Sequence, residues 1–100
     1  NGLRHLKELK ELTLNFTGIQ ISDVAALGSG LGRLTGLREC TLLLGQTRVA
    51  DVTALASGLG QVAELEKCVL YCFGTDVADV GPLGAALGHL RKLRECVLNF

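Results

Sequence analysis

The chain has 100 residues, and its ten Lys and Arg residues balance its ten Asp and Glu residues, giving a formal net charge of zero. A neutral chain offers no basic excess to phosphates or anionic lipids, which argues against nucleic-acid and membrane-surface binding. Hydrophobic residues make up 48% of the chain, which excludes a disordered segment, and the length allows one domain at most. No apolar run reaches the roughly 18–20 residues of a membrane span. The chain begins at Asn1 without a methionine, so we expect it to be part of a longer protein.

A repeat of 28 residues runs through the whole sequence. Four leucines mark one of its columns: Leu9, Leu37, Leu65 and Leu93. Three aspartates, each followed by valine, mark another: Asp23, Asp51 and Asp79. Neighbouring units align without a gap. We therefore expect a single array of about 3.5 repeats over 1–100, with partial units at 1–8 and 93–100 around full units at 9–36, 37–64 and 65–92.

A helix-like start and a strand come first along the chain. Leu3 and Leu6 have helical spacing, and the segment Leu12–Phe16 then alternates in the way that predicts a strand. Its first, third and fifth side chains share one face, which we expect to point inward, and the others point outward. The same pattern recurs over 40–44, 68–72 and 96–100.

A short helix is predicted after each of the first three strands. Apolar residues recur at helical spacing from Val24, and Asp23 precedes them as a potential N-cap. Gly32 stands where a left-handed C-cap favours glycine, as do Gly60 and Gly88 in the later units. We expect helices of about eight to ten residues. Since one strand–helix unit cannot bury its apolar face alone, the units should stack.

The strand residues resemble a known repeat family. The patterns Leu37-x-x-Cys40-x-Leu42 and Leu65-x-x-Cys68-x-Leu70 resemble the LxxLxL core of leucine-rich repeats, and the period resembles the ribonuclease-inhibitor-like subclass. The resemblance covers the whole chain. It implies a right-handed α/β solenoid with a parallel sheet on the concave face and short helices on the convex face. Members include ribonuclease inhibitors, Ran GTPase-activating proteins and many binding proteins, so the resemblance indicates fold better than activity.

The loop after each strand departs from that family. The family places Asn or Cys three residues after the last strand leucine, whereas this column holds Thr17, Gly45 and Phe73. The buried asparagine ladder is therefore absent. We expect inward apolar side chains to anchor the longer loop instead: Ile21, Val49 and Val77.

The four cysteines occupy apolar columns. Cys40, Cys68 and Cys96 share a column with Leu12, and Cys72 shares one with phenylalanine and leucine. We expect free core thiols, because an unpaired cysteine behaves as a small hydrophobic residue. A disulfide between stacked cysteines is the main alternative, although in-register side chains point the same way. A metal site is disfavoured, because no histidine shares these columns. Buried thiols indicate a reducing, intracellular compartment such as the cytoplasm.

Catalytic and cofactor motifs are missing from the pattern. The histidine column is His5, Arg33, Gln61 and His89, which is typical of a solvated position. No Ser–His–acid triad can be assembled from matched columns, and no glycine-rich phosphate loop follows a strand with a lysine behind it. The aspartate column lacks further oxygen ligands for calcium. We therefore expect no enzyme activity, no cofactor and no metal.

The outward strand residues are the predicted binding site. They have an apolar, aromatic centre and a charged rim, as protein-binding hot spots do. The candidate partner-binding residues are Thr41, Leu43, Val69, Tyr71, Phe73, Val97 and Asn99. They predict a non-catalytic protein–protein interaction module or scaffold subunit within a larger assembly. The alternatives are a regulatory role, such as GTPase activation or enzyme inhibition, and packing of these residues on a neighbouring part of the same protein.

Overall fold

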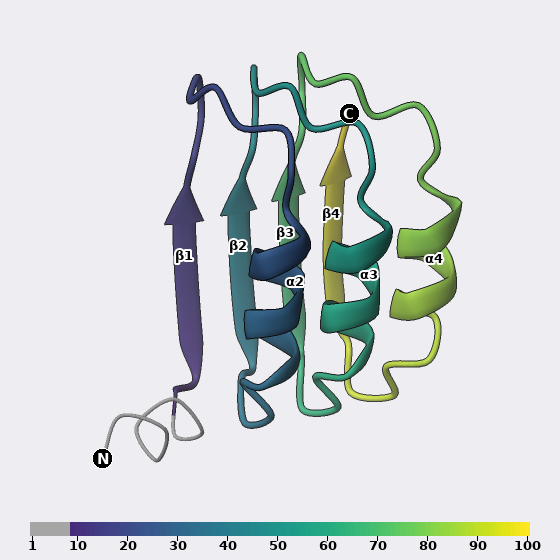
Figure 1. Cartoon of the computed structure of the whole chain (residues 1–100). Coiled ribbons are helices and arrows are strands. Elements are labelled where there is room, and N and C mark those ends of the chain that lie inside the picture. Colours follow the sequence, from purple (N-terminus) through teal and green to yellow (C-terminus); the bar gives the residue numbers. More distant parts are fainter. Residues whose placement is uncertain (1–8) are drawn as a thin grey trace.

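The computed structural model describes residues 9–100, so the expected partial unit at 1–8 lies outside the described range. Four strands form one parallel sheet in the order β1-β2-β3-β4: Glu11–Asn15, Glu39–Leu43, Lys67–Tyr71 and Glu95–Asn99. Three helices alternate with them: α2 (Ala25–Gly32), α3 (Thr53–Gly60) and α4 (Gly81–Leu87). All three helices lie on the same side of the sheet (Figure 1). The predicted α/β class with a parallel sheet is confirmed.

The strands pair in the register that the repeat predicts. Leu14 pairs with Leu42, and Leu42 pairs with Leu70, so partners are separated by one repeat. Each strand begins and ends one residue earlier than its alternation pattern. The ladder also continues past the strand ends, because the Gln46 N–H donates to the Phe73 carbonyl at 2.9 Å. Neighbouring units therefore stay side by side as far as Phe73.

The core lies between the sheet and the helices. Inward strand leucines and the helix leucines that face them are fully buried, for example Leu42, Leu55 and Leu70 at 0% exposure. The loop anchors behave as predicted: Val49 is fully buried, and Ile21 and Val77 pack against the same core. Burying this apolar area is the main source of stability, since each leucine contributes roughly 1.5–3 kcal/mol.

The aspartate column lies one residue before the predicted place, because the N-cap residues of the helices are Val24, Val52 and Val80, but its carboxylates still bind the first helical N–H groups. The Oδ1 atoms of Asp23, Asp51 and Asp79 each accept a backbone N–H from two residues ahead, at 2.8 Å. The hydrogen bonds from Thr53 hold the pKa of Asp51 below its ordinary value. A carboxylate also suits this place because a helix N-terminus carries partial positive charge.

The left-handed glycine prediction at the helix ends is wrong. The residues that close the helices, Arg33, Gln61 and Gly88, have φ angles of −87°, −88° and −64°, which are right-handed. Positive φ occurs instead in the turn after each strand, at Gly18 (77°), Gln46 (58°) and Gly74 (79°). These three residues share one column of the repeat, so a single turn geometry is used three times. The sequence did not indicate this left-handed position, because the middle unit has Gln46 where the other two have glycine.

Two helix glycines allow α2 and α3 to approach closely. A side chain at Gly28 would collide with the Ala54 carbonyl, and one at Gly58 would collide with the Gly28 carbonyl. The glycines that weaken an isolated helix are therefore needed where these two helices touch.

Three of the four cysteines match the core prediction. Cys40, Cys68 and Cys72 are free and buried. The prediction is wrong for Cys96, which is exposed. The physical reason is its position on the last strand, since no helix follows β4 in the described chain.

The outer face of the sheet as candidate functional site

The helix-free face of the sheet carries the predicted site. We define the outer face as the outward side chains at three positions of each strand, together with Phe73. The positions form three rows across the strands: Glu11, Glu39, Lys67 and Glu95; Thr13, Thr41, Val69 and Val97; Asn15, Leu43, Tyr71 and Asn99. The helices cover the opposite face (Figure 1), so this face is open to a partner.

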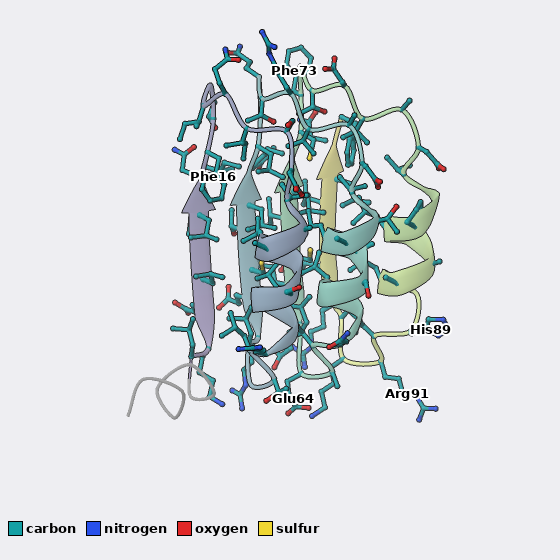
Figure 2. All side chains as sticks on the ribbon, viewed as in Figure 1. Phe16, Glu64, Phe73, His89 and Arg91 are labelled. Atoms are coloured by element: carbon teal, nitrogen blue, oxygen red, sulfur yellow. The ribbon has the colours of Figure 1, made fainter. Side chains whose placement is uncertain are left out.

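An apolar and aromatic patch lies at the carboxyl end of β2 and β3. Tyr71 is 41% exposed, Phe73 is 67% exposed, and Leu43 beside them is half-buried. Figure 2 shows Phe73 at the end of the molecule where the strands run into their loops. Neither aromatic residue belongs to the core cluster. Their exposed area is therefore not used by the fold of the described chain.

The middle row of the outer face, which contains Thr41, Val69 and Val97, differs in exposure from strand to strand. Val69 is only 7% exposed, although it does not belong to the core cluster between the sheet and the helices. Thr41 on one side is half-buried, whereas Val97 on the other side is 42% exposed. Asn99 is exposed at the end of β4. The predicted residues are thus brought together on one face, although Val69 offers little surface of its own.

Gly45 shapes the patch and was not among the predicted site residues. A side chain built on Gly45 would stand 3.3 Å from the Phe73 carbonyl oxygen and 3.9 Å from Cγ2 of Thr17. Glycine therefore lets the chain after β2 lie close to the backbone at Phe73, where a larger side chain would press on the Phe73 carbonyl. Its presence in a column with threonine and phenylalanine was the sequence signal that pointed to it.

The charged row borders the site at the other end of the strands. Lys67 Nζ lies 3.9 Å from Glu95 Oε2, and both side chains are substantially exposed. Within residues 9–100, Glu11 and Glu39 form no ion pair. An exposed pair of this length contributes little to stability, so these charges remain free to meet a partner.

The turns before the strands hold paired charges. Lys92 Nζ lies 2.8 Å from Glu64 Oε2, one repeat away, and Arg38 lies 3.8 Å from Glu66. The hydrogen bond from Lys92 holds the pKa of Glu64 below its ordinary value. Figure 2 shows Glu64 at the end of the molecule opposite Phe73. These pairs link neighbouring units and lie away from the apolar patch.

Potential metal ligands and thiols are two kinds of reactive group among residues 9–100. No group of three potential metal ligands comes together among residues 9–100. Burial raises the pKa of the Cys40 and Cys72 thiols to about 11 and that of Cys68 to about 12, so they stay protonated at neutral pH. A protonated, buried thiol is a poor nucleophile. None of the helices within this range is long and apolar enough to cross a membrane.

No model of a known protein family matches the chain, and no curated protein matches it. The functional argument therefore depends on the residues of the outer face and their geometry.

Proposed function

We propose that the chain is a leucine-rich-repeat solenoid that binds a protein partner through the outer face of its sheet and performs no catalysis. The stacking of units one repeat apart, with strands on one side and helices on the other, supports the solenoid interpretation. In such an array the sheet lines the concave face, where successive units present one continuous surface.

The exposure of Tyr71 and Phe73 beside Leu43 is the observation that carries the binding proposal. Aromatic side chains supply large contact areas at low entropy cost and dominate interface energetics. Two aromatic side chains that the core does not use, placed on a helix-free sheet, are best explained by a partner that covers them.

We also place the protein in a reducing, intracellular compartment. All four cysteines are free, including the exposed Cys96. A secreted protein of this size would be expected to pair its thiols.

The double variant Tyr71→Ala/Phe73→Ala tests the binding proposal. The variant should lose capture of partners that the unchanged chain retains from a cell extract, because hot-spot aromatic residues cost about 2 kcal/mol or more each when truncated. Its circular dichroism spectrum and unfolding midpoint should stay unchanged, since both side chains lie outside the core cluster.

The control is Val80→Ala, which removes an exposed apolar side chain just before α4. Partner capture should survive this change. Equal capture by the double variant and the unchanged chain would refute the proposed site.

A further inference from the structure

The residue before each of β2, β3 and β4 and the first residue of the strand are both charged, and their order is reversed at β3. Arg then Glu lead into β2 and β4, whereas Glu then Lys lead into β3. The three pairs are Arg38 and Glu39, Glu66 and Lys67, and Arg94 and Glu95. All six side chains line one open hollow, whose three positive and three negative charges cancel. The order of these charges, and not their sum, is therefore the distinguishing feature of the hollow.

The first residues of the pairs form a row of alternating charge. The Glu66 N–H donates to the Arg38 carbonyl at 2.7 Å, and the Arg94 N–H donates to the Glu66 carbonyl at 2.7 Å, so the three residues lie side by side. Arg38 Nε lies 3.8 Å from Glu66 Oε2. The carboxylate of the third unit thus has an arginine residue on each side.

The second residues form a row with the opposite signs. Lys67 pairs in register with Glu39 on one side and with Glu95 on the other. Lys67 Nζ lies 3.9 Å from Glu95 Oε2. Because the order is reversed in both rows, every contact of the third unit in these rows places opposite charges next to each other.

The apolar columns do not distinguish the neighbours of a strand. The inward positions hold cysteine and then leucine in all three strands: Cys40, Cys68 and Cys96, followed by Leu42, Leu70 and Leu98. If β4 lay beside β2, the same apolar side chains would meet. Arginine would then lie beside arginine and glutamate beside glutamate, and like charges directly opposite one another destabilise a sheet.

We infer that the charge reversal at β3 is a conformational device that holds the third unit between the second and the fourth. A single exposed ion pair contributes little to stability. The four contacts considered together, two in each row, bring opposite charges together in the observed order, and all four would bring like charges together if the third unit had the order of its neighbours. Charges that penalise a wrong strand neighbour specify the pairing where similar units share one apolar pattern.

Exchanging the two charges of the third unit tests this inference in the full chain. Glu66→Arg/Lys67→Glu keeps the formal net charge at zero and gives all three units the same order. Its melting midpoint, followed by circular dichroism in about 0.02 M salt, should lie about 4 °C or more below that of the unchanged chain, because several weak like-charge contacts add up in a domain of this size. In about 0.5 M salt the difference should fall to roughly half or less, since exposed charges are then screened.

Two control variants separate charge order from side-chain identity. Lys67→Arg/Arg94→Lys keeps the order of charges and should keep the melting midpoint of the unchanged chain. Glu66→Gln/Lys67→Gln removes the attraction without adding repulsion, so its midpoint should lie between those of the unchanged chain and the exchanged variant.

A compensating variant completes the test. Four further substitutions in the exchanged variant invert the second and fourth units as well: Arg38→Glu, Glu39→Arg, Arg94→Glu and Glu95→Arg. The charges then alternate again with every sign inverted, and the melting midpoint should recover most of the loss.

Three results would overturn the inference. Equal midpoints for the exchanged variant and the unchanged chain would mean that the order of charges has no effect. A loss of the same size in about 0.02 M and about 0.5 M salt would assign the effect to packing, because screening would have reduced a repulsion. A compensating variant as unstable as the exchanged one would show that the individual side chains matter and their alternation does not.

Discussion

The four cysteines lie in two different environments, buried and exposed, which depend on their positions in the fold. Cys40 on β2 and Cys68 on β3 are register partners and are buried, whereas Cys96 continues the same column on β4 and is exposed. Burial disfavours the thiolate, which raises the pKa of Cys68 to about 12 and also raises the pKa of Cys96 from its ordinary value.

Alkylation of the native protein should therefore modify one thiol. With iodoacetamide at pH 8, Cys96 should react while Cys40, Cys68 and Cys72 stay unmodified, as mass spectrometry of digested protein would show. The protein in urea should be modified at all four. Rapid modification of Cys68 in the native state would contradict the buried ladder.

The same shifts fix the direction of the pH dependence. A thiol whose pKa is raised by folding favours the folded state in its protonated form. Its contribution to folding stability is complete below the unfolded pKa near 9.0 and is lost as the pH rises towards about 11–12. The three buried thiols should therefore resist alkylation at pH 10 as well, provided the chain remains folded at that pH.

Residue-scale prediction from the sequence worked where neighbours in the repeat share one environment. The column-mates of Cys40 and Cys68 correctly indicated an apolar site. The same reasoning failed at Cys96, because no further strand or helix follows β4 among the described residues to cover it. It also included Val69 among the contact residues, since a sequence pattern predicts the side of a strand on which a side chain lies but not its exposed fraction, which is 7% for Val69.

Helix–helix distances explain why one repeat column tolerates different residues. Gly28 in α2 and Gly84 in α4 share a column, with Ala56 between them. A side chain at Gly28 would stand 2.6 Å from the Ala54 carbonyl carbon, whereas nothing lies within 4 Å of one at Gly84. The column is therefore restricted to glycine at only one of these two helices.

The substitutions Gly28→Ala and Gly84→Ala should change stability in opposite directions. Gly84→Ala should raise the free energy of unfolding by about 0.5–1 kcal/mol, because alanine is the better helix former. Gly28→Ala should lower it by about 1–3 kcal/mol, because the added methyl group forces the backbones of α2 and α3 apart. Urea unfolding monitored by circular dichroism measures both, and a stabilising effect of both changes would contradict the close approach of these helices.

The elements were predictable because two periods alternate in each unit. Strand pairing, the aspartates that bind the helix starts and the inward apolar loop anchors follow from that pattern. The turns were not predictable, because Gln46 adopts a left-handed conformation that glycine would have signalled. The close packing at Gly45 was missed as well, because its repeat column indicated Thr17 and Phe73 as neighbours but not the short distance to the Phe73 carbonyl.

At the scale of the whole molecule, the two faces of the sheet differ in use. One face packs against the helices and forms the core. The other carries Leu43, Tyr71 and Phe73 with no covering element among residues 9–100. The helices present small, uncharged residues to solvent, such as Ser57 and Ala85. The sequence located the outer face correctly, whereas its function as a partner surface stays a prediction.

Site-specific photo-cross-linking tests that prediction most directly. A benzophenone amino acid is placed at position 71 on the outer face or at position 57 or 85 on the helices, and all three variants are exposed to the same captured partner. The account predicts a cross-linked product from position 71 and none from positions 57 and 85. Cross-links from the helix positions with none from position 71 would contradict it.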